Sequence, residues 1–278
     1  MKETVAIVGI GRVGTSIGVA LCSAGYRIIG LSSRGKKDSP LFSVCKDFSI
    51  KPYEVTGLAD IVFLTVPDDV IEEVCRKIAR FGGFKDSSLV IHTSGALSSD
   101  ILSSAEGCRY LSIHPVKLFT SLCPVSLKGV YFSIEGSDTD TGIRIVKDIG
   151  GIPFLINRED KLLYHAVLSF SSSHLTGLIG LEVSILERAG LDKRLAILLA
   201  RDTLKNIDKD GVMTSFAGPV RRIDKGTIKK EIEALKGVSR IAVDTYRLLT
   251  RLSVYVEREL GVINKEDADS LMEILGGE

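Results

Sequence analysis

The chain of 278 residues lacks a charge excess, a cysteine pattern and a long apolar run. Its 36 Lys and Arg balance 35 Asp and Glu, so it has no electrostatic footprint for nucleic acid or a membrane surface. Its five cysteines are odd in number and contain no CxxC pair, which argues against a disulfide framework and a zinc cluster. Serines, His174 and Glu182 interrupt the most apolar helical stretch, residues 167–186. A buried helix therefore explains that stretch better than a membrane span.

The first residues lead directly into a strand-like run, without the charged and apolar regions of a signal peptide. Together with the scattered cysteines, which indicate reduced thiols, this predicts a cytoplasmic protein. We expect no metal site, no nucleic-acid partner and no membrane association.

The most informative segment is the glycine motif that follows the apolar run 4–8 and precedes a helical pattern. This order of strand, GxGxxG and helix is typical of a dinucleotide-binding site. We expect Gly9 to make the tight turn, Gly11 to let the backbone approach a pyrophosphate, and Gly14 to let helix and strand pack closely. The predicted cofactor-binding residues here are Gly9, Ile10, Gly11, Arg12, Val13 and Gly14.

The end of the second predicted strand, residues 26–31, favours NADP over NAD. NAD-preferring sites place Asp or Glu near this position to bind the ribose 2′-hydroxyl. Here the strand ends in Ser32, Ser33 and Arg34, with Lys36 and Lys37 following and no carboxylate before Asp38. Hydroxyls and cations suit a 2′-phosphate; the alternative is a solvated basic turn.

Strand-like and helical segments alternate up to about residue 155, and from Glu159 only helical patterns follow. This order predicts an α/β protein with a doubly wound parallel sheet and an all-α second domain. The expected domains are residues 1–157, which bind the nucleotide, and residues 158–278, which bind substrate and pair two subunits.

Polar residues lie at the predicted carboxyl ends of several strands, where ligands of open parallel sheets bind. Val66 and Pro67 follow one strand and should contact the cofactor. Ser94, two residues after His92, is expected at the cofactor or as a donor to substrate, whereas a turn residue is its alternative. His114 is a candidate acid/base for hydride transfer. His92 and His114 could each have a structural role instead of a catalytic one. For His92 this role is a hydrogen bond to the backbone.

The first long helix, predicted over residues 161–189, offers further candidates. Lys161 and His165 share a helical stripe with Ser169 and Ser172, and in an otherwise apolar helix this stripe should face a wet cleft. The alternative is a capping lysine with small packing serines. His174 should lie on the opposite face, in a core or an interface.

Taken together, the motifs resemble a largely uncharacterised family of Rossmann-like NADP oxidoreductases with a helical C-terminal domain of unknown function. That family is similar to pyrroline-5-carboxylate reductases and to the 6-phosphogluconate and β-hydroxyacid dehydrogenases. The segments that carry the resemblance are residues 9–14, 60–68, 92–95, 112–115 with Phe119, 164–165, and 218–220 with Arg222 and Asp224.

The resemblance implies an NADP-linked Rossmann fold, a C-terminal domain like that of 6-phosphogluconate dehydrogenase, and subunits paired through helical domains. The chain departs from the pattern at Ser173, where asparagine is expected, and at Ile223, where glycine is expected. The related dehydrogenases use Lys and Asn on the helix that carries Ser173. His114 with Pro115 is also similar to the His-Pro of prephenate dehydrogenases, whose histidine contacts the substrate hydroxyl.

These residues lead to one main hypothesis and one alternative. The first is an NADP(H)-dependent oxidoreductase acting on a small polar carbonyl, hydroxy acid or imine. In it His114 is the acid/base, Ser94 orients the substrate, and His165 or Lys161 completes the pocket. The alternative is a non-catalytic NADPH-binding sensor or assembly protein on the same fold.

Overall fold

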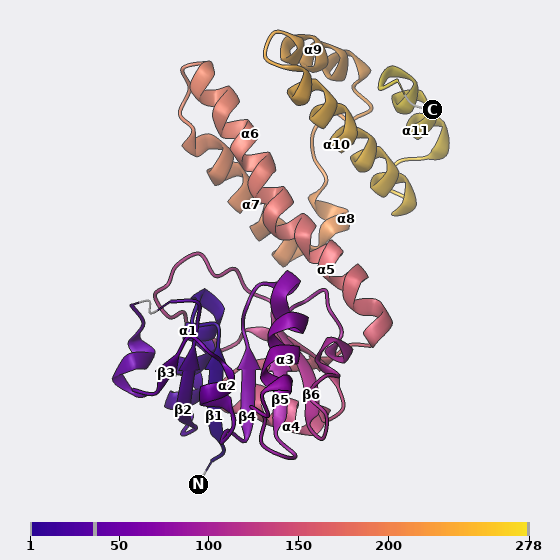
Figure 1. The fold of residues 1–278 in the computed structure, drawn as a ribbon. Helices are drawn as coiled ribbons and strands as arrows, with labels where there is room; N and C mark the ends of the chain where they lie inside the picture. The colour runs from indigo at the N-terminus through magenta and orange to yellow at the C-terminus, as the bar shows by residue number, and fades with distance from the viewer. Residues whose placement is uncertain (1, 36–37, 277–278) are drawn as a thin grey trace. The chain divides into compact units, whose positions relative to one another are not determined.

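The computed structural model describes residues 2–35 and 38–276. Contacts divide the chain into two compact units, Met1–Ser172 and Ser173–Glu278 (Figure 1). The boundary expected from the sequence, between residues 157 and 158, follows the last strand and precedes the helix α5 (Lys161–Ser169). In the structure α5 belongs to the first unit.

The first unit is built on an eight-stranded sheet in the order β3-β2-β1-β4-β5-β6-β7-β8. Its first six strands have the 3-2-1-4-5-6 order of a Rossmann sheet, in which the direction of winding reverses between β1 and β4. The strands are β1 Thr4–Val8, β2 Arg27–Ser32, β3 Phe48–Ser49, β4 Ile61–Leu64, β5 Leu89–His92, β6 Arg109–Pro115, β7 Tyr131–Gly136 and β8 Ile152–Leu155.

The predicted doubly wound parallel sheet is present, with one antiparallel pairing, that of β6 with β7. The segment 116–130 between them contains no helix. A parallel neighbour needs a long crossover, usually helical, whereas an antiparallel neighbour needs only a reversal of the chain. β8 then pairs with β7 in parallel, after the crossover through α4 (Thr139–Asp148).

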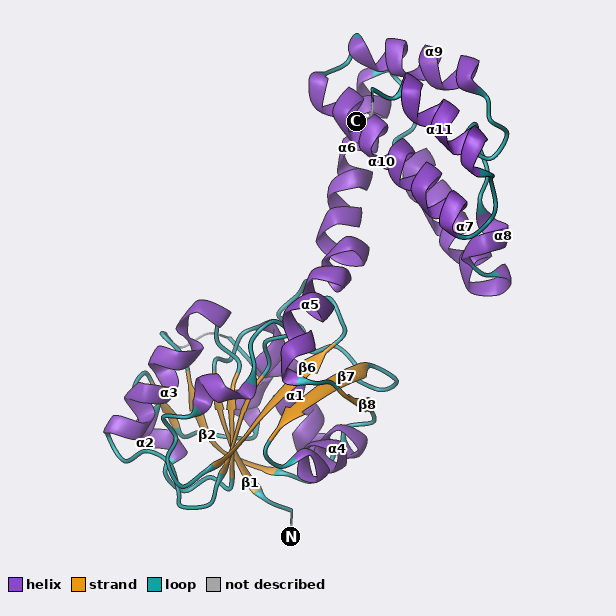
Figure 2. Cartoon of the chain, turned by 90° about the vertical axis from the view of Figure 1, so that its right-hand side faces the viewer, coloured by secondary structure: helices purple, strands orange, loops and turns teal. Residues whose placement is uncertain are grey.

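Helices cover both faces of this sheet (Figure 2). Alternate residues of β1 serve the two layers: Val5 and Ile7 pack with α1 (Arg12–Ser23) and α4, while Ala6 and Val8 pack with α3 (Ile71–Arg80). A central strand that is buried on both faces is apolar throughout, which explains the uninterrupted apolar run. The short helix α2 (Tyr53–Thr56) lies near α3 and β2.

The predicted helix over residues 161–189 is interrupted. It consists of α5 (Lys161–Ser169), a π-helical segment (Phe170–His174) and α6 (Leu175–Arg188). A π turn contains more residues than an α turn. The 100° per residue that placed His165 and His174 on opposite faces therefore does not hold across this segment.

The second unit is all helical in its described residues. Its core contains Val220, Ile228, Val254 and Leu271 and lies among the last three helices. In chain order the helices after α6 are α7 Arg194–Asp210, α8 Val212–Ser215, α9 Lys225–Lys236, α10 Arg240–Glu259 and α11 Lys265–Ile274. Among the residues described, no helix is both long and apolar enough to cross a membrane.

Large apolar side chains remain exposed on the second unit. Leu199 on α7 is 69% exposed, and Leu248 and Leu252 on α10 are 65% and 53% exposed. Val254 on the same α10 is buried in the core of the unit. α10 is therefore apolar on two faces, of which the isolated chain covers one.

Candidate active site

The glycine turn after β1 is held by close backbone packing. Gly9 has a φ of +103°, its N–H donates to the Ser32 carbonyl at 2.7 Å, and its own carbonyl accepts from Thr65 Oγ1 at 2.6 Å. A Cβ added to Gly14 would lie 2.1 Å from the Gly9 carbonyl oxygen. Gly9 and Gly14 thus meet the geometric demands of the motif.

Gly11 differs from these two glycines because a Cβ built on it would meet nothing within 4 Å. It is the N-cap of α1, so the unpaired N–H groups of the first helical turn begin beside it. A cavity of about 480 Å³ lies over this turn, and helix N-termini of this kind bind phosphates. The residues around the cavity are Gly9, Ile10, Gly11, Arg12, Val13, Ser33, Arg34, Thr65, Val66, Pro67, Asp68, Thr93 and Phe119.

A second cavity, of about 440 Å³, lies beyond the end of β2. Ser32, Ser33 and Arg34 line one part of it, and Val66, Pro67, Val70 and Val74 supply apolar walls. The Ser33 hydroxyl donates to the backbone of its own turn at 2.6 Å. Arg34 is exposed, which leaves its guanidinium accessible. The predicted cations Lys36 and Lys37 lie outside the described residues.

His92, at the end of β5, is a structural residue. Its Nδ1 accepts from the Ser94 N–H at 3.1 Å, and its Nε2 lies 3.1 Å from the Ser98 carbonyl oxygen. Burial, helped by the nearby Lys161 charge, lowers the pKa of His92 to about 3. The ring is therefore neutral, and both of its nitrogens hydrogen-bond to the backbone of the turn after β5. This agrees with the structural alternative for His92, a hydrogen bond to the backbone.

Ser94 is saturated by contacts within the protein. Its hydroxyl donates to Asp68 Oδ2 at 2.6 Å, and its Oγ accepts from the N–H groups of Ala96 and Leu97 at 3.2 and 3.1 Å. The single hydroxyl proton is thus already engaged. Ser94 is 4% exposed, and its neighbour Thr93 lines the cavity over the glycine turn instead.

Lys161, at the start of α5, is buried rather than facing a wet cleft. Only 1% of it is exposed, and its Nζ donates to Ser112 Oγ at 2.7 Å and to the Ser94 carbonyl at 3.5 Å. Burial lowers the pKa of the ammonium to about 8, although Glu135 and Asp68 oppose the shift. The side chain joins α5 to the turn after β5 and to the middle of β6.

The two remaining candidates, His114 and His165, meet at a cavity of about 310 Å³. Their ring centroids are 6.1 Å apart. A Cβ on Gly95 would lie 2.8 Å from an atom of each ring, so the two imidazoles pack directly over this glycine. The cavity is lined by His114, Pro115, Val116, Lys117, Leu118, His165, Leu168, Ser169, Ser171 and Ser172. Three members of the predicted stripe therefore reach it, and Lys161 does not.

His114 is held neutral, and its partner is a residue that the sequence reasoning missed. Burial, with the nearby Lys161 and His165, lowers the pKa of His114 to about 4. Tyr164 on α5 brings its Oη to 3.0 Å from His114 Nδ1. The sequence holds a signal for this contact only in the adjacency of Tyr164 to His165 within one of the family motifs.

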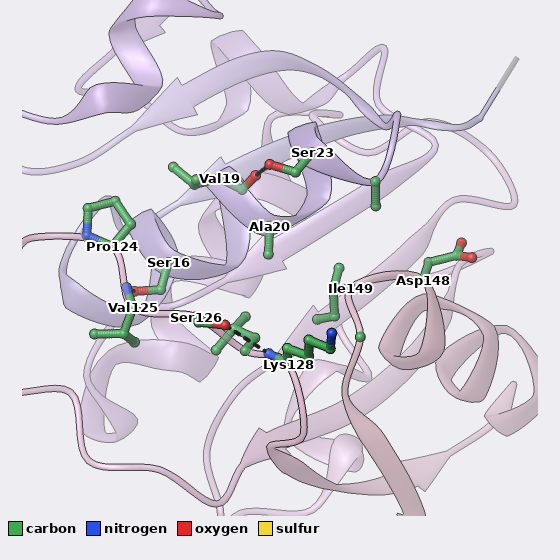
Figure 3. Close-up of a pocket in the computed structure, with 13 residues that line it drawn as sticks. Ser16, Val19, Ala20, Ser23, Pro124, Val125, Ser126, Lys128, Asp148 and Ile149 are labelled. Atoms are coloured by element: carbon green, nitrogen blue, oxygen red, sulfur yellow. Dashed lines mark hydrogen bonds between the residues drawn. The ribbon is translucent and has the colours of Figure 1, made fainter.

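Another hollow, of about 500 Å³, lies between α1, the segment 124–128 and the C-terminal end of α4 (Figure 3). Asp148 in its lining pairs with Lys2 at 2.8 Å, and two of its serines hydrogen-bond to nearby backbone groups. Ser16 donates to the Arg12 carbonyl at 2.9 Å and accepts from the Val125 N–H at 3.2 Å, while Ser23 donates to the Val19 carbonyl at 3.0 Å. This hollow has no set of polar groups converging on a common point.

Asp224 and His174, both singled out in the sequence, lie in the second unit. Asp224 caps α9 through the Thr227 N–H at 3.0 Å, and Arg221 donates to the Val262 carbonyl at 2.5 Å. His174, expected in a core or an interface, is exposed in the single chain. The described residues contain no group of three His, Cys, Asp or Glu that could hold a metal ion.

Two family models match successive parts of the chain. Residues 1–115 match a Rossmann-like domain, and residues 130–253 match the Domain of unknown function (DUF2520). The chain therefore carries a Rossmann-like domain followed by this domain of unknown function, the combination that the motifs resemble. A comparison with curated proteins gave no match.

Solved structures share the fold over most of the chain. Protein BF3122 from Bacteroides fragilis is 20% identical with a TM-score of 0.76, covering 90% of this chain and 97% of that one. Protein TM1727 from Thermotoga maritima is 25% identical with a TM-score of 0.70, covering 96% and 98%. Pyrroline carboxylate reductase from Plasmodium falciparum, solved with NADP bound, is 14% identical with a TM-score of 0.60, covering 99% of each chain.

Proposed function

We propose that the protein is an NADP(H)-dependent oxidoreductase that transfers hydride to or from a small polar carbonyl, hydroxy acid or imine. The observation that carries this proposal is the arrangement along one edge of the sheet. The glycine turn follows β1, Thr93 follows β5, and His114 lies near the end of β6. The cavity over the glycine turn and the cavity lined by the two histidines thus occur at the carboxyl ends of strands, where ligands of this fold bind.

The residues present fit the dinucleotide. Gly11 leaves room for a pyrophosphate at the start of α1, the apolar walls around Val74 suit an adenine, and Arg34 suits a 2′-phosphate. When bound, the nicotinamide supplies or accepts the hydride. The chain's own contribution is a neutral His114 at a cavity that admits a small molecule. The P. falciparum reductase, which shares the fold and was solved with NADP, supports the choice of cofactor.

Arg34→Ala is expected to weaken NADPH binding by roughly ten- to a hundredfold, because a charge-assisted contact to phosphate contributes about 1.5–3 kcal/mol. NADH, which lacks the 2′-phosphate, should bind the variant and the wild type alike. Fluorescence titration of both cofactors measures this. Arg27→Ala is the matched control, since Arg27 is exposed at the opposite end of the same strand. Equal affinity of the wild type for NADPH and NADH would disprove the NADP assignment.

The assembly proposed for this enzyme is a homodimer formed through the helical unit, in a reducing cytoplasmic environment. The exposed apolar face of α10 supports pairing, because a helix apolar on two faces must bury both and a symmetric dimer does so with one surface. Light scattering should give twice the 30.1 kDa of the chain.

The combined substitution Leu248→Glu and Leu252→Glu should convert the dimer to a folded monomer, because both side chains are exposed in the single chain. Lys229→Glu, on an exposed position of α9, should remain dimeric. A wild-type monomer at micromolar concentration would contradict this assembly.

The alternative, a non-catalytic NADPH sensor, predicts cofactor binding without turnover. One assay distinguishes the enzyme from the sensor. The NADPH-loaded protein is supplied with 2-ketoacids, ketopantoate and cyclic imines, and the absorbance of the reduced nicotinamide is followed. Oxidation of NADPH with any of these substrates supports the enzyme.

A further inference from the structure

The contact between His114 and Tyr164 joins two elements of the first unit at the edge of the cavity. His114 lies in β6 and Tyr164 in the first turn of α5. The Nδ1 and Oη atoms are 3.0 Å apart, and the two rings meet edge to face with centroids at 5.8 Å. Phe154 on β8 packs edge-on against the tyrosine ring at 6.0 Å. The rings of His114 and Phe154 therefore hold the phenol of Tyr164 in place, with its Oη within hydrogen-bond distance of His114 Nδ1.

The environment of His114 decides its charge. The ionisable groups that influence it are Lys161 and His165 on α5, and both lower the pKa of His114, in addition to burial. The ring is therefore neutral near pH 7, with one nitrogen protonated and the other an acceptor. Which nitrogen carries the proton is set by the hydrogen bond that the other one makes.

Tyr164 supplies that hydrogen bond. An imidazole nitrogen is a much stronger base than a phenol oxygen, so the favourable direction is O–H donating to Nδ1. Burial also raises the pKa of Tyr164, which keeps the phenol protonated. The remaining proton of the His114 ring then resides on Nε2, on the edge of the ring that packs over Gly95. Nε2 makes no hydrogen bond to any residue that the structure describes.

We propose that Tyr164 is a positioning residue that fixes His114 as its Nε2–H tautomer and supplies a proton through it. The proposal deepens the proposed function and its catalytic part rests on it. His114 lines the cavity, and a neutral ring that carries its proton on Nε2 can donate to a carbonyl oxygen or imine nitrogen of a substrate bound there. The acceptor class is therefore a C=O or C=N group, polarised by a neutral donor rather than by an imidazolium.

In the reduction of a carbonyl, each bond that forms is matched by a bond that breaks. A reduced nicotinamide would supply the hydride for the new C–H bond, and the electron pair of the C=O π bond would move to oxygen. The Nε2–H bond of His114 breaks as the product O–H bond forms, while the Tyr164 O–H bond breaks as an Nδ1–H bond forms. An alkoxide is a stronger base than a phenolate, so this transfer is downhill. Nδ1 then returns its proton to Tyr164, and Nε2 takes one proton from water.

The positioning role is testable without substrate or cofactor. In protein labelled with ¹⁵N-histidine, NMR at pH 7 should show His114 with a protonated Nε2 and an unprotonated Nδ1, assigned by loss of the signal in His114→Gln. In Tyr164→Phe the two nitrogen shifts should move toward a mixture of tautomers. Tyr131→Phe, at an exposed tyrosine of β7, should leave them unchanged. A wild-type ring protonated on Nδ1, or unchanged shifts in Tyr164→Phe, would overturn the proposal.

Kinetics then separates this proposal from the proposed function. With any substrate that is turned over, Tyr164→Phe should lower kcat by about tenfold to a hundredfold, since positioned acid/base groups contribute 10²–10⁴-fold and the histidine remains. KM and NADPH affinity should change little. If the protein shows the Nε2–H tautomer but none of the supplied substrates leads to oxidation of NADPH, the oxidoreductase function is refuted. The assignment of the His114–Tyr164 contact then remains valid. Active enzyme with an unaltered kcat in Tyr164→Phe refutes the proton supply alone.

Discussion

Replacing His114 with alanine should lower kcat by about 10²–10⁴-fold, the usual effect of removing a positioned acid/base group. NADPH affinity should stay within about twofold of the wild type, because His114 lines the cavity beside Lys117 and Ser169 and is absent from both cavities at the glycine turn. Steady-state kinetics and a cofactor titration on the same preparation measure the two effects. His174→Ala, which changes an exposed histidine outside this cavity, is the control and should retain its turnover.

The pH dependence of the same reaction checks the charge of His114. Its pKa of about 4 leaves the imidazole neutral from pH 7 down to 5.5, so its contribution to turnover should stay constant over that range. A histidine with an ordinary pKa near 6.5 would change its protonation there. A steep change in kcat that follows a pKa of about 6.5 in the wild type and disappears in His114→Gln would contradict the neutral donor.

The glycine motif could be predicted from the sequence because its demands are local. Gly9 needs a positive φ, and Gly14 lies within a few residues of the carbonyl oxygen that it would otherwise strike. The alternation of strands and helices in the Rossmann part could be predicted for the same reason, since each strand and its helix are adjacent in the chain. The reversal at β7 was missed because the apolar pattern of a strand carries no direction.

The surroundings of the candidate catalytic residues depend on contacts between segments distant in sequence. The sequence therefore predicted the position of some of these residues and missed others. Lys161 shares a helical stripe with His165, but its partner Ser112 is 49 residues away, and that contact draws the ammonium into the interior. Periodicity places a residue on a face of a helix and does not show what the neighbouring strand presents to that face. The contact of Tyr164 with His114 also joins residues distant in sequence. The helical pattern therefore did not predict it.

Substitutions at two glycines of the turn should separate folding from cofactor binding. In Gly14→Ala the new Cβ would lie 2.1 Å from the Gly9 carbonyl oxygen and 2.4 Å from Thr65 Oγ1. The backbone of β1 and α1 has to move apart, and overpacking of this kind costs about 1–3 kcal/mol or more. Thermal denaturation should therefore show the unfolding transition of Gly14→Ala lowered by several degrees, at about 2–4 °C per kcal/mol for a chain of this size.

Gly11→Ala should behave in the opposite way. No atom lies within 4 Å of the added Cβ, and the backbone of Gly11, with a φ of −83° and a ψ of −157°, is accessible to alanine. The fold should therefore lose at most about 1 kcal/mol, the difference between glycine and alanine at a helix N-cap. The methyl group occupies the space through which a pyrophosphate would reach the N–H groups of α1, so NADPH affinity should fall by at least about tenfold, or about 1.4 kcal/mol. If calorimetric titration shows that Gly11→Ala binds NADPH as tightly as the wild type, the phosphates do not bind at this turn, and the cavity over it has another purpose.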